Sequence, residues 1–353
     1  MAIYLHDKYA SRIDKKFTEE SITRGRFTGK VDFTGVRTVR ITTPQTVPLT
    51  DYKRQGTNRY GEPQEMQDTV QEMTLTQDKS FAMTIDKGNN TDQGALKAAG
   101  KMMAMEIQQE CVPALDRYVF DRIAHKAGVI SASGTALSKT NICERLSGAM
   151  AEMDDAEVPT EGRTIFLPSK HFSMLRMSPE FIGLEKLGDR ALSKGEVGEF
   201  AGAAVVKVPA GRWPKGVNFI IAHKSAVVVA QKLSDTKLHT DPPGTSGNLL
   251  EGRFYYDCFV FEQKAPGVYT EIATGAGVTV VETPSITAST GAISCGTGGA
   301  TIYYTTDGSD PRYSANRKTG NAADVKTAGT VVKAYAEKAD CFPSAVAEAV
   351  LTG

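Results

Sequence analysis

The sequence predicts an α+β protein with a small all-β domain at its C-terminal end, and three observations carry this prediction. Residues 91–126 place apolar side chains at three- and four-residue spacings, which is the pattern of a long amphipathic helix. Short runs of alternating apolar residues on both sides of this segment are typical of β-strands. From Gly275 onward the composition shifts to Thr, Ala, Gly and Ser with short β-branched runs, which indicates a small antiparallel sandwich.

The helix predicted over residues 91–126 is the element around which the chain is organised. Its apolar stripe consists of Leu96, Met103, Ile107, Cys111, Leu115 and Tyr118. At about 1.5 Å per residue the helix would be roughly 50 Å long. Asn90, Thr91 and Asp92 can cap its start, and Gly128 can end it. Pro113 lacks a backbone donor, so it is expected to kink or split the helix.

The segment before this helix is predicted to contain a long hairpin with a polar tip. Apolar and polar residues alternate over residues 35–46 and again over residues 69–85, which predicts two strands. Residues 51–66 between them are polar, punctuated by glycine and almost without aliphatic side chains, so they cannot belong to a core. A projection of this kind is stable only where another surface receives it. Residues 3–24 are expected to form an amphipathic helix or a partly ordered arm.

The region after the helix is predicted to mix helices and strands. Asn141 with Glu144 three residues later is a capping-box arrangement, which predicts a second amphipathic helix, and residues 181–194 are predicted to be a polar connection. Strands are predicted at residues 163–167, 253–262 and 267–272, and strands or a short helix at residues 203–208, 218–222 and 226–229. In the C-terminal domain, six short strands are predicted at residues 278–281, 285–288, 292–295, 301–306, 330–337 and 345–351.

Composition and charge limit the classes of function. The formal charge of the 353 residues is zero, so the whole molecule has no electrostatic reason to bind nucleic acid or a membrane. The longest apolar run, residues 219–230, is interrupted by His223 and Lys224 and cannot span a bilayer. The first 20 residues carry charges throughout and show no secretory signal, so the protein is expected to stay in the cytoplasm. The five cysteines are odd in number and widely separated, which argues against a disulfide framework or a structural zinc site.

No catalytic, cofactor or metal site is predicted, so the chain is not expected to be an enzyme. Residues 94–102 are close to a phosphate-binding loop but carry Met102 where a Ser or Thr should bind magnesium. Residues 234–237 (SDTK) match a Ser-x-x-Lys pair without a supporting motif. The histidines share no metal-ligand spacing. Asp307 and Asp310 could hold calcium, but Asp-Gly between alternating strands is first of all a turn.

Several stretches, through their order and spacing, carry a resemblance to a known family. They are TDQ at residues 91–93 after residues 81–88, ECVPALDRYVFDR at residues 110–122, residues 195–202 followed by 205–209, residues 220–226, and residues 253–269. Over residues 1–273 the chain resembles the major capsid proteins of tailed bacteriophages with the Hong Kong 97-type shell fold. Residues 301–311 (TIYYTTDGSDP) and 331–338 (VVKAYAEK) look like the immunoglobulin-like modules at the carboxyl end of chitobiase-type enzymes.

The resemblance implies a division of the chain into five parts. These are an N-terminal arm and first strand (1–48), an extended-loop hairpin (49–88), the spine helix of the peripheral domain (89–130), the axial domain with the return strands of the peripheral domain (131–274), and an immunoglobulin-like surface domain (275–353). In this fold the extended loop overlaps a neighbouring subunit. The candidate subunit-interface residues on the loop are Lys53, Arg54, Arg59, Tyr60, Glu62 and Glu65.

The function implied is that of a major capsid protein that self-assembles, through pentamers and hexamers, into the icosahedral head shell around the double-stranded DNA genome of a tailed bacteriophage. The expected partners are copies of itself, portal and scaffold proteins, and packaged DNA through non-specific contact, with no membrane. Assembly is expected in the host bacterial cytoplasm, and the final location is the virion. The immunoglobulin-like domain would face outward, where weak contacts with host-surface or mucosal glycans gain from copy number. Because this domain looks self-contained, its removal is expected to leave assembly largely intact.

Two alternatives stay open. An encapsulin-type compartment, which packages protein cargo, is a shell of the same fold. A glycan-binding or glycosidase-accessory protein would rest on the last quarter of the chain alone. It would need catalytic carboxylates in the first 273 residues, where no paired candidate stands out.

Overall fold

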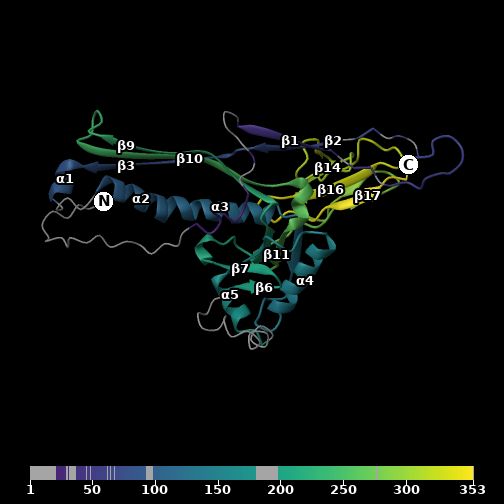
Figure 1. The fold of residues 1–353 in the computed structure, drawn as a ribbon, viewed down its shortest axis with the longest axis horizontal. Coiled ribbons are helices and arrows are strands. Elements are labelled where there is room, and N and C mark those ends of the chain that lie inside the picture. The colour runs from purple at the N-terminus through teal and green to yellow at the C-terminus, as the bar shows by residue number, and fades with distance from the viewer. Residues whose placement is uncertain are drawn as a thin grey trace. The chain divides into compact units, whose positions relative to one another are not determined.

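The computed structural model describes residues 21–28, 31, 37–44, 46–47, 49–61, 63, 65–66, 68–92, 98–179, 198–275 and 277–352. The chain divides into two compact units, drawn as ribbons in Figure 1. The first comprises Met1–Gly35, Leu75–Val260 and Lys264–Thr274, and the second comprises Val36–Thr74, Phe261–Gln263 and Gly275–Gly353. Most of the predicted arm, up to residue 20, and the polar connection predicted at residues 181–194 lie outside the described residues.

The long helix of the first unit is built from three consecutive segments. They are α2 (Ala99–Glu106), a π-helical turn η1 (Ile107–Cys111) and α3 (Val112–His125). The irregularity expected at Pro113 is confirmed in this form, because the π-helical turn ends just before Pro113. Proline has no N–H to donate to the preceding turn, and a π-helical turn changes the hydrogen-bond pattern at this point.

The two ends of this helix test the predicted capping residues. The N-terminal prediction is wrong, because Thr91 and Asp92 belong to a separate short helix, α1 (Lys87–Asp92), and α2 begins after Ala98 without a side-chain cap. The helix ends near the predicted residue, at His125, but its C-cap is Lys126, and Gly128 has no positive φ and does not cap it.

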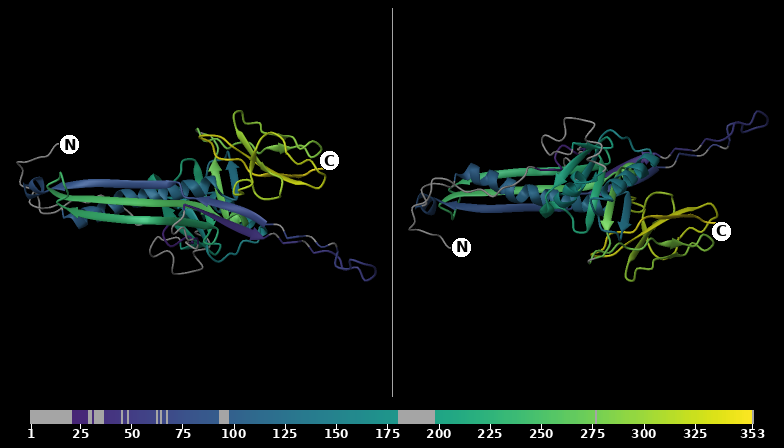
Figure 2. Two further views of the ribbon diagram at one scale, coloured as in Figure 1. Left: turned by 90° about the horizontal axis from the view of Figure 1, so that it is seen from above. Right: turned by 90° about the horizontal axis from the view of Figure 1, so that it is seen from below.

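A three-stranded antiparallel sheet of the order β3-β10-β9 runs along this helix (Figures 1 and 2). Its strands are β3 (Gln77–Asp86), β9 (Val227–Thr240) and β10 (Gly247–Val260). The sequence predicted only residues 226–229 and 253–262 of the β9–β10 hairpin, because most side chains at residues 231–240 are exposed and show no apolar alternation. Gly252 lies opposite Phe81 in this sheet, and a Cβ atom there would come within 2.3 Å of the Phe81 ring.

The hairpin predicted from residues 35–46 and 69–85 is correct only in its outer half. Strand β1 (Thr38–Pro44) pairs antiparallel with β2 (Asp68–Thr74). The rest of the second predicted strand is β3, which pairs with β10 instead. The chain leaves its first pairing at Thr76, whose N–H and hydroxyl donate to the buried carboxylate of Asp257 at 2.9 and 2.7 Å.

The other part of the first unit is a six-stranded mixed sheet of the order β4-β11-β8-β5-β7-β6. Its strands are β4 (Val129–Ser133), β5 (Arg163–Pro168), β6 (Glu199–Phe200), β7 (Ala203–Val208), β8 (Val217–His223) and β11 (Val268–Ala273). Two 3-10 helices, η2 (Ala210–Arg212) and η3 (Glu262–Gly267), lie in the connections. The strands predicted at residues 163–167 and 267–272 are confirmed, and residues 203–208 and 218–222, predicted as strands or a short helix, are strands.

Helices α4 (Ile142–Asp155) and α5 (Ser169–Arg176) pack on this sheet. The core between them includes Leu146, Ile165 and Phe219, which are fully buried. The predicted helix after Asn141 is confirmed, but the predicted capping box is wrong. The Asn141 side chain accepts the N–H of Ser138 at 2.8 Å and makes no cap to α4.

The second unit contains the ribbon β1–β2 and an all-β module (residues 275–353). The module strands are β12 (Ser285–Ile286), β13 (Ile293–Ser294), β14 (Thr301–Thr305), β15 (Lys318–Thr319), β16 (Val331–Glu337) and β17 (Ala347–Val350). They form one sheet of the order β15-β14-β16-β17 and the pair β12-β13. The strand predicted at residues 278–281 is reduced to isolated bridges, and β15 was not predicted. The other five predicted strands are present in shortened form.

Candidate subunit interface

The loop between β1 and β2, residues 45–67 and hereafter the extended loop, reaches beyond the ribbon (Figure 2). Its described residues are held by local hydrogen bonds. The N–H of Lys53 donates to the carbonyl of Arg59 at 2.9 Å, and the N–H of Gly61 donates to that of Asn58 at 3.0 Å. Asn58 and Gly56 have φ of 54° and 90°, the left-handed conformation that tight turns require. Turn geometry, and not a core, shapes this loop.

The extended loop concentrates exposed apolar surface. Of the nine large hydrophobic side chains that are exposed in the described part of the chain, five lie on it. They are Val47, Leu49, Tyr52, Tyr60 and Met66. Leu49 is fully exposed, Tyr60 is 86% exposed, and the Tyr52 and Tyr60 rings meet edge to face with centroids 5.0 Å apart. Apolar side chains gathered on one projection are typical of a surface that another protein covers.

Five of the six predicted interface residues are described, and all five are exposed. They are Lys53, Arg54, Arg59, Tyr60 and Glu65. Glu62 lies outside the described residues. The structure brings Lys53 and Arg59 together through their backbones and places Tyr60 against Tyr52. Sequence reasoning missed the exposed apolar side chains other than Tyr60, although each is an apolar residue in a polar stretch.

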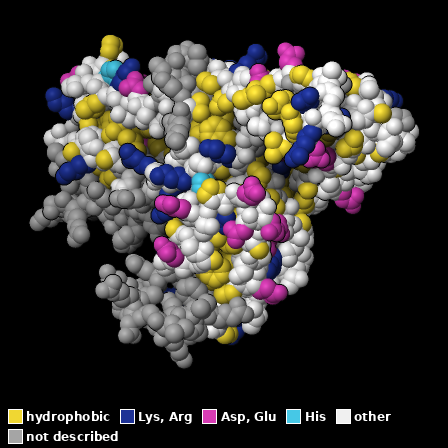
Figure 3. Space-filling model, turned by 45° about the vertical axis from the view of Figure 1, so that its right-hand side comes forward, with side chains coloured by type: hydrophobic (Ala, Val, Ile, Leu, Met, Phe, Trp, Pro, Cys, Tyr) yellow, Lys and Arg dark blue, Asp and Glu magenta, His cyan; other side chains and the backbone are white. Residues whose placement is uncertain are grey.

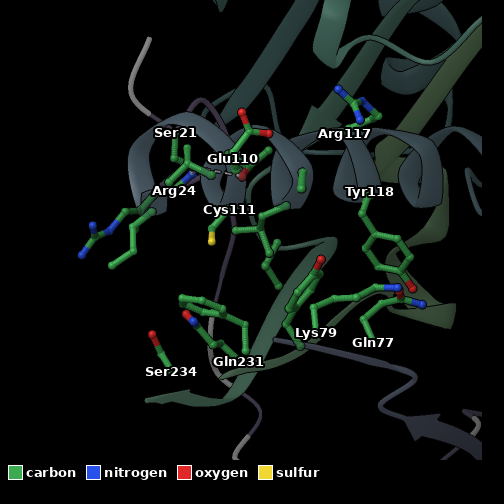
Figure 4. A pocket seen from close by; sticks show the side chains of 18 of the residues that line it. Ser21, Arg24, Gln77, Lys79, Glu110, Cys111, Arg117, Tyr118, Gln231 and Ser234 are labelled. Atoms are coloured by element: carbon green, nitrogen blue, oxygen red, sulfur yellow. Dashed lines mark hydrogen bonds between the residues drawn. The ribbon is translucent and has the colours of Figure 1, made fainter. Parts of the chain in front are cut away.

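A cavity of about 1040 Å³ lies in the first unit between residues 21–28, the long helix and the three-stranded sheet (Figure 4). Two of its lining residues bear on catalysis. Burial, with the negative charges of Glu106 and Glu110 nearby, raises the pKa of the Cys111 thiol, so the thiol stays protonated and unreactive. Burial raises the pKa of Tyr118 to about 12. Neither group is poised to act as a nucleophile or a base at neutral pH.

One wall of this cavity is fixed by the buried carboxylate of Asp116 on α3. Its oxygens accept the hydroxyls of Ser21 and Thr23 at 2.9 and 2.6 Å and the N–H of Ile22 at 3.0 Å. Arg212 donates to the same carboxylate at 2.8 Å. Asp116 is fully buried and Arg212 is 5% exposed. Residues 21–23 are therefore tied to the long helix at one position.

Within the described residues, no group of three His, Cys, Asp or Glu side chains could hold a metal ion. The turn predicted at Asp307 is confirmed, because its carboxylate accepts the N–H of Ser309 at 3.0 Å and the side-chain amide of Asn316 at 3.3 Å. Burial alone would raise the pKa of Asp307, but these hydrogen bonds outweigh burial and lower it. Asp310 pairs with Arg312 at 2.7 Å. Both carboxylates have protein partners, which favours a turn over a calcium site.

Surface charge is unevenly distributed on the face drawn in Figure 3. Acidic side chains gather in the lower part of this view, the level at which α4 lies in Figure 1. The exposed acids of α4 and the turn after it are Glu144, Glu152, Asp154, Asp155 and Glu157. Such a surface repels DNA phosphates and is unsuited to hold nucleic acid.

The comparisons with known proteins give one family match and several similar structures. Residues 276–348 match the family described as Chitobiase/beta-hexosaminidase C-terminal domain. A structure from Mycobacterium phage Che8 is similar with a TM-score of 0.62 and 16% identity, over 77% of this chain and 98% of that chain. The asymmetric unit of the bacteriophage PhiM1 mature capsid is similar with a TM-score of 0.61 and 12% identity, over 76% of this chain and 92% of that one. The capsid structure of the Cyanophage P-SCSP1u is similar with a TM-score of 0.61 and 13% identity, over 77% of this chain and 93% of that chain.

The chain has a phage capsid fold. This confirms the predicted fold class, an α+β capsid fold with a C-terminal immunoglobulin-like all-β module. None of the curated proteins matches the chain in sequence. Among the helices that the structure describes, none is long and apolar enough to cross a membrane.

Proposed function

We propose that this chain is a major capsid protein that self-assembles into the icosahedral head shell around the double-stranded DNA genome of a tailed bacteriophage. The observation that carries the proposal is the extended loop, which on a capsid fold projects exposed apolar side chains with no core beneath them. A two-stranded ribbon with such a tip gains stability when a second copy covers it. The role is structural and not enzymatic.

The proposed partners follow from the steps of shell assembly, which are initiation, DNA packaging and closure. Other copies of the chain would form pentamers and hexamers, and portal and scaffold proteins would direct where the shell begins and how it curves. Packaged DNA would be contacted without sequence preference, away from the acidic surface of α4. Assembly would occur in the cytoplasm of the host bacterium, and the mature location would be the virion. No observation favours an encapsulin-type compartment.

The test uses the exposure of the loop side chains. Leu49→Ser combined with Tyr60→Ser removes apolar surface that makes no core contact, so the free energy of unfolding should change by less than about 0.5 kcal/mol. Electron microscopy and sedimentation velocity should show hollow shells or five- and six-membered rings for the wild type, expressed with scaffold and portal genes, and none for the variant. Val325→Ser, an exposed hydrophobic position of the module, is the matched control and should assemble normally. A wild-type chain that stays monomeric or dimeric, alone and with these genes, would refute the proposal.

A finer part of the proposal concerns glycans. The family match of residues 276–348 supports a module that contacts host-surface or mucosal glycans. The Tyr303 ring already stacks on the Tyr335 ring, with centroids 5.4 Å apart, and the guanidinium carbon of Arg317 lies 4.7 Å from the Tyr303 ring centroid. Because this ring is already stacked, a sugar would be held mainly by hydrogen bonds. Binding by one copy would be weak, and binding by the many copies on a particle would be strong enough to be useful. Assembled particles that bind no glycan on an array would remove this part alone.

A further inference from the structure

The module contacts the ribbon β1–β2 through an isolated β-bridge. Strand β2 pairs with β1 along one edge. Along its other edge, Gln71 forms an antiparallel bridge with Ser314, and the N–H of Ala315 donates to the carbonyl oxygen of Val70 at 2.9 Å. A two-stranded ribbon is marginally stable in water, and three strands are needed for independent stability. The module adds backbone contacts along the edge of β2 that does not pair with β1.

Side chains add a second contact at the same place. The side-chain oxygen of Gln71 accepts the N–H of Glu262 at 3.1 Å, and the carboxylate of Glu262 accepts the N–H of Asp310 at 3.0 Å. Gln71 is only 7% exposed, and Met73, on the same face of β2, is fully buried. Burial raises the pKa of Glu262, as expected where little water reaches the carboxylate. The junction is packed and hydrogen-bonded, and it joins three separate segments of the second unit.

The module segment that makes these contacts is held in shape by its own hydrogen bonds. It begins with DGSDP at residues 307–311, the element that the sequence indicates as a turn. The carbonyl of Asp310 accepts the N–H groups of Tyr313 and Ser314 at 3.1 and 2.9 Å. Its carboxylate accepts the N–H and a guanidinium nitrogen of Arg312 at 2.9 and 2.7 Å. A segment fixed in this way loses little conformational entropy when it pairs with a strand.

We infer that the module braces the ribbon: Asp310, Ser314 and Ala315 fix β2, and with it the direction in which the extended loop leaves the second unit. A module that only displayed a glycan-binding surface would have no use for this contact. The consequence for assembly rests on the proposed function, whereas the brace itself does not. The inference also changes the expected effect of removing the module, since removal would take away the bridge and the hydrogen bond on this edge of β2.

The brace is tested by removing one hydrogen-bond donor from the full chain. Ala315→Pro abolishes the N–H that pairs with Val70, and Ala315→Ser keeps that N–H and is the matched control. Hydrogen exchange measured by mass spectrometry on unassembled subunits should be about tenfold faster in residues 38–44 and 68–74 of the proline variant, because one lost hydrogen bond weakens the local structure by about that factor. Residues 331–337 in the module core should exchange as in the wild type, which shows that the module remains folded.

A second variant covers the case in which proline disturbs the module. Gln71→Met keeps the length of the side chain and removes the oxygen that accepts from Glu262, so the same ribbon peptides should again exchange faster. Unchanged exchange of the ribbon in both variants, with a folded module, would overturn the brace.

Assembly gives the second readout. Variants with a loosened ribbon should form fewer or irregular shells under conditions in which the wild type and Ala315→Ser form regular ones. Regular shells from a variant whose ribbon exchanges faster would overturn the role of the brace in assembly. A wild type that forms no shells would instead count against the proposed function, and the exchange measurement would still decide whether the module braces the ribbon.

Discussion

Replacing Asp116 by Ala should destabilise the first unit more than most single substitutions. The change removes a fully buried carboxylate that accepts four hydrogen bonds and leaves the guanidinium of Arg212, which is 5% exposed, without it. Removing one partner of a buried ion pair lowers the free energy of unfolding by about 3–5 kcal/mol. Because a folded domain is stable by only about 5–15 kcal/mol, this is a large part of the total.

The assay follows the single tryptophan, Trp213, which is next to Arg212 and packs against Phe120 with ring centroids 5.5 Å apart. Its fluorescence in a urea titration should give a lower midpoint for Asp116→Ala with an unchanged slope. Asp121→Ala on the same helix is the control, because the Asp121 side chain is 55% exposed and its loss should cost less than about 0.5 kcal/mol.

A double variant separates the buried charge from the rest of the network. Asp116→Leu with Arg212→Met removes both charges, so it should recover part of the loss. Recovery is incomplete because the N–H of Ile22 still lacks its acceptor. A loss below about 1 kcal/mol for Asp116→Ala, or a double variant no more stable than the single one, would refute this reasoning.

Three further predictions use other parts of the chain. A Cβ at Gly128 would lie 2.0 Å from the backbone oxygen of Ala265, so Gly128→Ala should lower the thermal midpoint. Gly148→Ala in α4 places no atom within 4 Å of the new Cβ, so it should raise the free energy of unfolding by up to about 1 kcal/mol. Equal effects of the two substitutions on the thermal midpoint would contradict both predictions. Burial lowers the pKa of His171 below 6.5, so the unfolded chain binds the proton first as the pH falls. The stability contributed by neutral His171 is fully present above pH 6.5 and falls as the pH drops toward the pKa of the folded state. Urea titrations should show this loss in the wild type and not in His171→Asn. Removing residues 54–66 should leave the circular dichroism and melting of the subunit intact and abolish shells in electron microscopy; normal particles would exclude the assigned role of the loop.

The fold elements that the sequence predicted best are those buried on both faces. Strands β5 and β8 are almost wholly buried, and the apolar runs at residues 165–167 and 219–222 placed them within one or two residues. The middle of the β9–β10 hairpin was missed because its side chains face water, so no apolar period marks it. The change of partner at Thr76 was missed for another reason. Apolar alternation continues through it, and the interaction that redirects the chain is a hydrogen bond to Asp257, 181 residues away.

The subunit interface on the extended loop stays a prediction, and the structure adds exposed side chains to the candidate residues. The polar composition of residues 51–66 indicated a projection that needs a partner surface, and the exposure of the described residues agrees with that. The chosen side chains were mainly charged, whereas the structure adds exposed apolar ones such as Leu49. A hydrophobic residue in a polar stretch gives no periodic signal, and only its measured exposure separates it from a residue that folds back onto the protein.

Two buried carboxylates explain how the long helix can serve as a frame. Asp116 ties residues 21–23 to α3, and Asp257 on β10 accepts the hydroxyl of Tyr118 on the same helix at 2.7 Å. Apolar contacts alone would tolerate small shifts along the helix, whereas a buried carboxylate is satisfied in one arrangement only, and every other arrangement carries a desolvation penalty. In a closed symmetric assembly each contact is repeated by symmetry, so a small error in the direction of one segment recurs in every copy. Burying these charges costs stability, and in return residues 21–23 and the sheet each have a single position on α3, which is the property that the proposed role as a shell subunit requires.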